Sequence, residues 1–208
     1  MQVKQVFFFI AIFLSYFVMA QPGLKGGLNY SNITNTKQVN SSSRAGFHIG
    51  GFLSAGNKGI ISSRTELIFS RQGYNFETST NTGNATLDYI ILPQLVGINI
   101  TKFVQLQAGF QFAYLLSAKT DSNRVSSVPG PLMKLNDIYN RFDYGFAAGI
   151  EIHPVQGLII GARANFSLGK LYKEPQPGQV PSVIPDINAK NNVIQVFAGW
   201  RFGKKKTA

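Results

Sequence analysis

The 208-residue chain has a formal net charge of +11, no cysteine and only 14% charged residues. Soluble domains average about 25% charged residues, so this composition, with 17 Phe and 8 Tyr, argues against a surface that meets water throughout. The lack of cysteine excludes disulfides and thiolate metal sites. Lys and Arg are scattered apart from the run from Lys204 to Lys206, which argues against a nucleic-acid partner.

The first residues have the layout of a secretory signal peptide. Lys4 precedes a mostly apolar run at 6–19, and the small residue Ala20 follows at the expected cleavage point. The run is shorter than the ~20 residues of a transmembrane helix. An uncleaved anchor is the alternative. We expect residues 1–20 to be the signal peptide and residues 21–208 to form one exported domain.

The mature chain alternates apolar and polar side chains over successive segments. In the clearest segment, Leu106, Phe110 and Phe112 share one face while Gln107 and Gln111 share the other. A period of two indicates a β-strand, and a membrane-spanning strand needs about 9–11 residues. The pattern predicts eight strands, at residues 22–32, 44–54, 60–76, 87–100, 103–116, 142–152, 158–169 and 192–202.

The fourth predicted strand departs from this pattern. Ile90, Ile91, Leu92 and Leu95 occupy both faces, so its outward face cannot be assigned from the sequence. Pro93 removes a hydrogen-bond donor from the sheet, and we expect a bulge or a local distortion to accommodate it.

The connections between the predicted strands alternate between long and short. Outer-membrane barrels have an even number of strands, short periplasmic turns and longer external loops. We therefore predict an all-β fold, an eight-stranded antiparallel up-and-down transmembrane β-barrel in the cell outer membrane. The long connections are at 31–43, 77–86, 119–141 and 170–191, and the short ones are at 55–59, 100–102 and 154–157.

Charged side chains share the polar face of the predicted strands. An eight-stranded barrel leaves room in its bore only for side chains, and buried charges need partners. We expect a structural charge network that fills the lumen, with a proton or ion path as the alternative. Its members are Arg64, Glu66, Asp143, Glu151, Arg163 and Arg201. The histidines, His48 and His153, show no metal-ligand spacing, so we expect structural roles for both.

The last predicted strand must close the barrel against the first one. It ends in two large aromatic residues, Trp200 and Phe202. Trp200, Tyr114, Tyr144 and Tyr172 lie near predicted strand ends, where amphipathic rings settle at the level of the lipid headgroups.

Three stretches resemble the PorT-like outer-membrane β-barrel family of the Bacteroidetes. They are D-Y-x-x-L-P from Asp88 to Pro93, S-R-Q-G from Ser70 to Gly73, and the aromatic ending from Phe197 to Phe202. Ile91 departs from the family, which has an acidic residue there. The resemblance implies a membrane barrel whose last strand is read by the barrel-insertion machinery. The family takes its name from a member that is associated with protein secretion. Only by analogy with that member does the resemblance imply secretion-system proteins as partners.

No catalytic arrangement is visible in the predicted loops. They contain Asp121, Asp137, Glu174 and Asp186 but no histidine, so we expect no enzyme, no metal and no cofactor. Basic residues around the external loops can contact lipopolysaccharide phosphates. These are Lys119, Arg124, Lys134, Arg141, Lys170 and Lys173.

The expected function is that of a small, monomeric, non-enzymatic outer-membrane barrel. It would serve as an accessory of protein secretion or as an envelope interaction protein, in contact with outer-membrane lipid and lipopolysaccharide. Two alternatives stay open at this point. One is a narrow solute conduit, and the other is a soluble lipocalin-like binding barrel with its apolar face inside.

Overall fold

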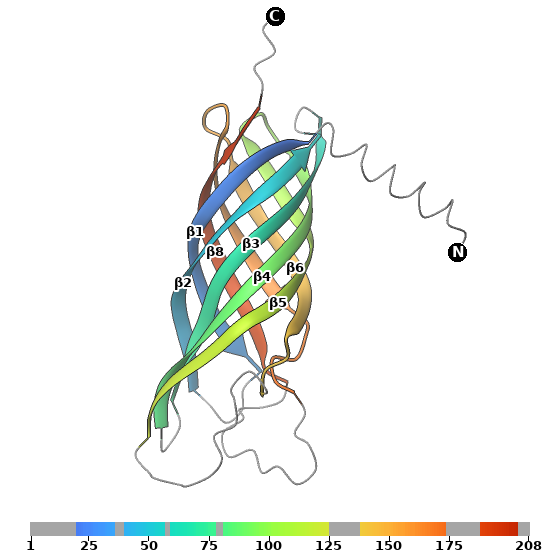
Figure 1. Ribbon diagram of the computed structural model, residues 1–208. Helices are drawn as coiled ribbons and strands as arrows, with labels where there is room; N and C mark the ends of the chain where they lie inside the picture. Colours follow the sequence, from blue (N-terminus) through green and yellow to red (C-terminus); the bar gives the residue numbers. More distant parts are fainter. Residues whose placement is uncertain are drawn as a thin grey trace, which may run out of the picture.

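Eight antiparallel strands form a closed barrel in the computed structural model, in which β8 pairs with β1 (Figure 1). This confirms the predicted fold class. The structure describes residues 20–35, 40–56, 59–77, 81–124, 138–173 and 188–203. The strands are β1 Gln21–Thr34, β2 Asn40–Ala55, β3 Ile61–Glu77, β4 Asn81–Asn99, β5 Val104–Arg124, β6 Phe142–Ile152, β7 Leu158–Ser167 and β8 Lys190–Arg201.

The predicted signal peptide, residues 1–20, lies outside the described residues except for Ala20. Among the residues that the structure describes, no helix is both long and apolar enough to cross a membrane.

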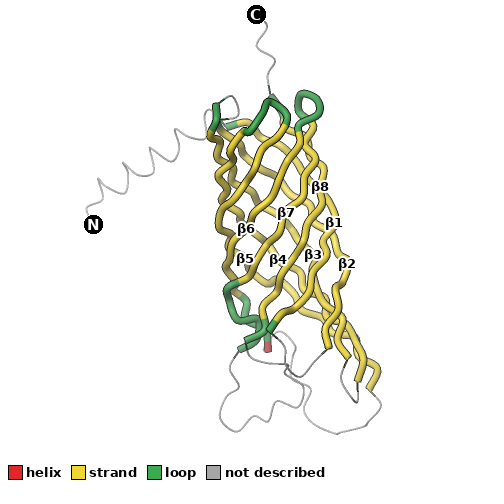
Figure 2. The backbone as a smooth tube through the Cα atoms, turned by 180° about the vertical axis from the view of Figure 1, so that it is seen from behind, coloured by secondary structure: helices red, strands yellow, loops and turns green. Residues whose placement is uncertain are grey.

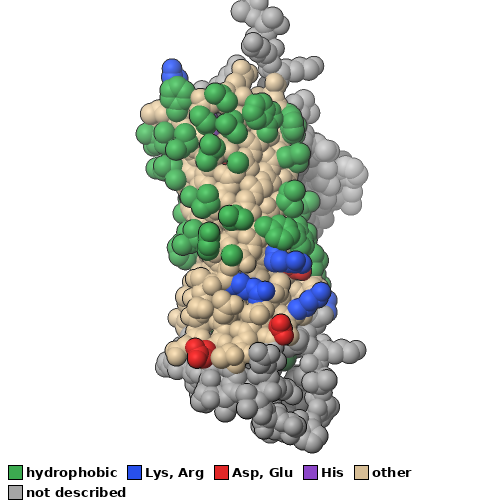
Figure 3. Space-filling model, turned by 90° about the vertical axis from the view of Figure 1, so that its left-hand side faces the viewer, with side chains coloured by type: hydrophobic (Ala, Val, Ile, Leu, Met, Phe, Trp, Pro, Cys, Tyr) green, Lys and Arg blue, Asp and Glu red, His purple; other side chains and the backbone are tan. Residues whose placement is uncertain are grey.

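The apolar face of each strand points away from the bore. Leu67, Phe110 and Phe146 expose between 50% and 57% of their surface, although they are large apolar residues. Figure 3 shows such side chains covering a belt on one side of the barrel. Because this face is outside, the lipocalin-like alternative is wrong, and the belt has the position of the lipid-facing band of a membrane barrel.

The outward face of β4 is also settled. Its odd-numbered residues point inward, so Leu87, Tyr89 and Ile91 are buried in the bore while Leu92 and Val96 are exposed. The alternation is lost in the sequence because the inward face of this strand is apolar too. That inward face packs into an apolar core cluster inside the barrel.

Pro93 is accommodated by a gap in pairing. The β3–β4 ladder runs through Thr65↔Gln94 and resumes at Ile68↔Ile91 in the same register. On the other side Pro93 pairs with Gln111, and the irregularity between β4 and β5 lies at Asp88/Tyr89 instead. The local distortion at Pro93 is therefore a two-residue interruption without a register shift.

Four strands continue well past the apolar belt at the long-connection end. The pairing of β5 with β6 ends at Tyr114, whereas beside β4 the strand β5 continues to Arg124. Figures 1 and 2 show β2 to β5 projecting beyond the other strands. We name this projection the polar ridge, which comprises residues 40–43, 75–77, 81–84 and 120–124.

The polar ridge corrects three predicted loops. Residues 40–43, 81–86 and 119–124 were expected in connections but are strand. Outside the belt both strand faces can be polar, so the apolar alternation used to delimit strands ends before the hydrogen bonding does. Side chains add to the pairing there, because Arg44 donates to the Asn84 amide oxygen.

The opposite end has short turns, as expected. Gly59 N donates to Gly56 O at 3.0 Å across the β2–β3 turn. Gly157, before β7, has a φ of 92°. A Cβ atom there would lie 2.9 Å from the Trp200 ring, so only glycine fits this turn.

Candidate functional site: the filled lumen

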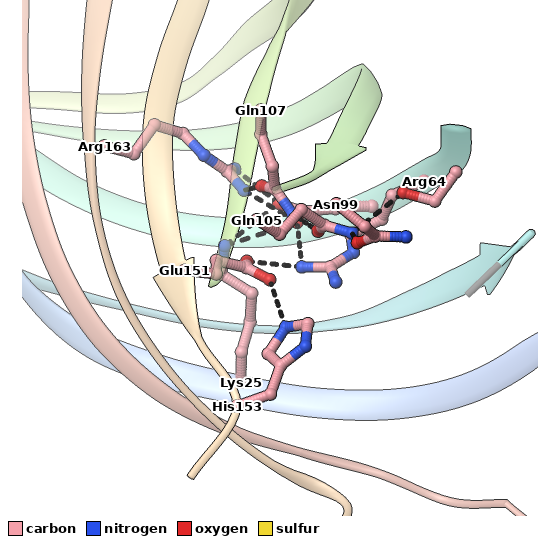
Figure 4. A network of polar contacts seen from close by, with 10 residues as sticks. Lys25, Arg64, Asn99, Gln105, Gln107, Glu151, His153 and Arg163 are labelled. Atoms are coloured by element: carbon pink, nitrogen blue, oxygen red, sulfur yellow. Dashed lines mark hydrogen bonds and ion pairs between the residues drawn. The ribbon is translucent and has the colours of Figure 1, made fainter. Parts of the chain in front are cut away.

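Five charged side chains meet inside the bore toward the short-turn end, and we name them the charge layer. Figure 4 shows their contacts. They come from four strands, with Arg64 and Glu66 both on β3, and each is at most 5% exposed. The members are Lys25, Arg64, Glu66, Glu151 and Arg163.

Glu66 is the centre of the charge layer. Arg163 donates to its carboxylate from Nη1 and Nη2 at 2.7 and 3.0 Å, and Lys25 Nζ lies 3.1 Å from Oε2. Arg64 Nη1 is 3.8 Å away and bonds Glu151 Oε1 at 2.5 Å. Since β3 and β7 face each other in an eight-stranded ring, the Arg163–Glu66 pair spans the bore.

Amide side chains extend the charge layer. Gln107 accepts a bond from Arg163 Nη2 at 3.0 Å and donates to Gln105 Oε1 at 2.7 Å. Gln105 then donates to Asn99 and to Ser62. These bonds hold the guanidinium of Arg163 in one orientation, as bidentate pairing requires.

Two phenylalanines inside the bore also contact the cations. Lys25 Nζ lies 3.8 Å from the centre of the Phe197 ring, and Arg64 Cζ lies 4.7 Å from that of Phe52. Cation–π attraction of this kind is strengthened when both groups are shielded from water.

Uncharged polar side chains fill the middle of the bore. Asn29 accepts from His48 Nδ1 at 2.8 Å and from Gln195 Nε2 at 3.1 Å, and donates to Ser70 Oγ at 2.9 Å. Nδ1 of His48 carries the proton in this arrangement, because the Asn29 amide nitrogen donates elsewhere. His48 therefore has a structural role here.

Three tyrosines close the bore toward the long-connection end, and we name them the tyrosine layer. Tyr74 OH lies 2.8 Å from Tyr139 OH and 2.5 Å from Tyr172 OH. The rings of Tyr139 and Tyr172 are 5.2 Å apart. Burial raises the pKa of Tyr139 and Tyr172, so both phenols stay protonated and can donate. The layer packs on Ile33, Ile68, Leu87, Tyr89, Ile91, Leu115 and Leu171.

The tyrosine layer corrects one expectation. Tyr172 was assigned to the headgroup level, yet it is 2% exposed and lies inside the bore. It follows β7 at the point where the chain turns inward to pair with Tyr139. Tyr114, Tyr144 and Trp200 are about half exposed on the outer face, as headgroup-level residues would be.

The structure brings together four of the six charged residues that were singled out. Arg64, Glu66, Glu151 and Arg163 are in the charge layer. Asp143 is not, because it lies near the long-connection end of β6 and accepts a bond from Ser167 Oγ at 2.7 Å. The strands are tilted, so residues with the same inward face can sit at different heights.

Arg201 lies at the short-turn mouth rather than inside the layer. Its Nη1 is buried and has no hydrogen-bond partner among the described residues. Lys25 was missed by the prediction, although its place on the polar face of the first strand was the available signal. Phe52 and Phe197 gave no signal, because an apolar residue on the inward face looks like a break in the pattern.

Two of the stretches that resemble the PorT-like family lie against each other. Arg71, of S-R-Q-G on β3, pairs with Asp88, of D-Y-x-x-L-P on β4. The guanidinium donates from Nε and Nη2 at 2.7 and 2.9 Å. The two stretches therefore form one feature, a bidentate pair on the outer face.

Side-chain contacts cross the diameter of the lumen at two heights, in the charge layer and in the tyrosine layer. No group of three or more His, Asp or Glu side chains that could hold a metal ion occurs within the described ranges. Among the external basic residues, Lys119 and Lys173 are exposed, Lys134 lies outside the described residues, and the side chain of Arg124 is also outside them.

Two solved structures are similar to this chain at low sequence identity. Ail, the attachment invasion locus protein of Yersinia pestis, is 14% identical with a TM-score of 0.50, over 88% of this chain and 99% of that one. The outer membrane protein OprG of Pseudomonas aeruginosa is 11% identical with a TM-score of 0.45, over 89% and 97%. A search of curated proteins finds no match.

The sequence profile of a family described as "Outer membrane protein beta-barrel domain" matches residues 19–173. The match covers most of the chain, from β1 through the charge layer to the tyrosine layer. This places the barrel in the outer membrane, with the apolar belt against lipid. The chain belongs to the outer membrane protein beta-barrel domain family.

Proposed function

We propose that this protein is a non-enzymatic, non-conducting anchor that presents the polar ridge to a partner in the cell envelope. The observation that carries the proposal is the ridge itself, a hydrogen-bonded sheet that continues beyond the belt for many residues. External loops face away from the cell in outer-membrane barrels. The ridge is at the long-connection end, and so it would project outward.

The ridge has the chemistry of a polar contact surface. A hollow of about 460 Å³ in it is lined by Ser42, Asn75, Glu77, Asn84 and Asp121, with one aromatic ring from Phe76. Hydroxyl, amide and carboxylate groups around a ring can hydrogen-bond a polar partner and pack against it.

The filled bore supports the non-conducting part of the proposal. The Arg163–Glu66 pair and the Tyr74–Tyr172 bond each join opposite walls. An open path would require both to separate, which would leave buried charges and hydroxyls unpaired. Planar-bilayer recordings should show no steady conductance, whereas a stable open-pore level would contradict the proposal. The closed ring also supports a monomer, because no strand edge is open within the belt.

Lipopolysaccharide is the lipid partner that we propose. Lys119 and Lys173 are exposed at the long-connection end, where they can pair with phosphates. The double change Lys119→Gln and Lys173→Gln should reduce the lipopolysaccharide that copurifies. The control variant, Lys102→Gln, removes an exposed charge at the other end. Equal retention in both variants would exclude this contact.

A role beside secretion components is a second proposal, supported by the PorT-like stretches that contain Arg71 and Asp88. Its partners would act from the periplasmic side, next to the short turns. Photo-crosslinking in cells separates the two proposals, with the reactive group at Thr82 in the ridge or at Gln156 in a short turn, both exposed. Adducts at Thr82 alone support the ridge proposal. Adducts at Gln156 alone would overturn it and favour the secretion role.

A further inference from the structure

A cavity at the short-turn mouth of the bore has an excess of positive charge. It has a volume of about 690 Å³ and is lined by three turns and the end of β8. Its polar lining includes Asn99, Lys102, His153 and Arg201. This cavity lies at the end of the barrel opposite the polar ridge, so a ligand bound in it would be independent of the proposed function.

The guanidiniums near this mouth outnumber the carboxylates. Arg64, Arg163 and Arg201 are three cations against Glu66 and Glu151, which leaves one positive charge over before Lys25 is counted. An arginine does not lose its proton in a protein. A buried excess charge is costly without a counter-ion, so this site favours an anion.

Two guanidiniums, one in the charge layer and one at the mouth, have donors that lack acceptors among the described residues. Arg64, whose side chain is 4% exposed, bonds Glu151 through Nη1, but its Nε and Nη2 have no hydrogen-bond partner among the described residues. Nη1 of Arg201 is buried and unpartnered as well. Arg201 lines the cavity, whereas Arg64 belongs to the charge layer deeper in the bore.

His153 joins the cavity to the charge layer. It lines the cavity, and its Nε2 lies 3.4 Å from Glu151 Oε2, while the other oxygen of Glu151 holds Arg64 (Figure 4). Glu151 thus fixes both the ring and the guanidinium from behind. A ligand that enters from the mouth meets His153 and Arg201, which line the cavity, before it reaches Arg64.

We propose that the cavity at the short-turn mouth binds a phosphate-type oxyanion at the guanidinium of Arg201, beside His153, with the excess positive charge of the charge layer behind them. Guanidinium groups match the tetrahedral oxyanion through paired N–H donors. Short turns face the periplasm in this class of barrel, so the anion would enter from that compartment. A free phosphate and the headgroup of a phospholipid in the inner leaflet offer the same chemistry.

The test uses the full-length barrel in an uncharged maltoside detergent and inorganic phosphate as the probe. Calorimetric titration and thermal unfolding, at constant ionic strength set with chloride, should show saturable binding. Arg201→Gln should weaken binding about tenfold or more, because a charge-assisted bond is lost. Arg71→Gln is the matched control on the outer wall and should bind as the wild type does. Circular dichroism verifies that both variants are folded.

A lipid arm identifies the source of the phosphate. The titration is repeated in nanodiscs of phosphatidylcholine alone and of phosphatidylcholine with phosphatidylglycerol. Competition by phosphatidylglycerol, dependent on Arg201, indicates a headgroup, and unchanged affinity indicates a free anion; either supports the site. A response that never saturates, or equal binding by the wild type and Arg201→Gln, would overturn the proposal.

Discussion

The two ends of the bore are filled by different chemistry, although the same eight strands line both. In the charge layer, Glu66 joins three cations that come from three strands. In the tyrosine layer, neutral phenols close the space, and two of the three come from segments outside the named strands. The charge layer depends on every partner being present, whereas the tyrosine layer depends on packing with a few hydrogen bonds added.

Both layers require ring closure, so a truncation gives the largest expected effect. Ending the chain before Val193 removes most of β8 and leaves β1 and β7 with open edges, which a membrane does not tolerate. We expect no folded barrel in outer-membrane fractions, read from boiled and unboiled gel samples. Deletion of residues 204–208 is the control and should leave migration unchanged. A folded, membrane-resident band from the longer truncation would show that closure does not depend on β8.

The charge layer is tested next by Glu66→Ala. Removing this carboxylate leaves Lys25 and Arg163 without their partner, so we expect a loss of about 3–5 kcal/mol in the free energy of unfolding. Urea titration in liposomes measures it. Glu77→Ala, at the exposed end of β3, should change stability by less than about 0.5 kcal/mol. Identical unfolding midpoints for the two variants would mean that the charge layer contributes nothing.

A charge placed on the outer wall lacks the ion-pair partners that charges have in the bore. Phe110 is half exposed in the belt, and arginine there would face lipid with no carboxylate near it. We expect Phe110→Arg to cost about 2–4 kcal/mol, the penalty near the bilayer midplane. Phe110→Leu should cost less than about 1.5 kcal/mol. If the arginine variant folds in liposomes as stably as the wild type, residue 110 does not face acyl chains.

The tyrosine layer should give the smallest change. Tyr74→Phe removes one hydroxyl that bonds two others, and we expect a loss of about 1–3 kcal/mol that does not vary with salt. Tyr30→Phe on the outer face, 49% exposed, is the control and should be close to neutral. If Tyr74→Phe lost more stability than Glu66→Ala, the tyrosine layer would contribute more to the free energy of unfolding than the charge layer.

Much of this architecture could be predicted from residue alternation. Bulky residues such as Phe110 and small or charged ones such as Arg163 stand on opposite faces, and that contrast reveals strand count, outer face and most of the charge layer. It fails where both faces are alike. Leu87 and Tyr89 on β4 point inward and Leu92 points outward, yet all are apolar.

The remaining misses have a geometric cause. Tyr139 and Tyr172 belong to segments outside the named strands, and no periodicity indicates that such residues turn back into the bore. Asp143 shares the inward face with Glu151 on β6, but eight residues of tilted strand separate them in height. In the ridge segments 40–43, 81–84 and 120–124, both faces of the strands are polar, so the sequence there resembles a loop. Alternation indicates whether a side chain points into the bore or out of it. It does not indicate how far along the barrel axis the residue lies, or where the chain turns back into the bore.

The gap at Pro93 has a consequence for the chain before it folds. The segment from Tyr89 to Val96 is apolar on both faces except at Gln94 and is rich in residues with high β-propensity, a composition that favours aggregation during transit to the membrane. A proline in its middle interrupts stacking between chains, while in the barrel the missing donor costs only two residues of pairing. We expect Pro93→Thr to speed aggregation of urea-diluted chains, measured by light scattering, and to leave the folded barrel as stable as before. Unchanged scattering would show that Pro93 has no such protective role.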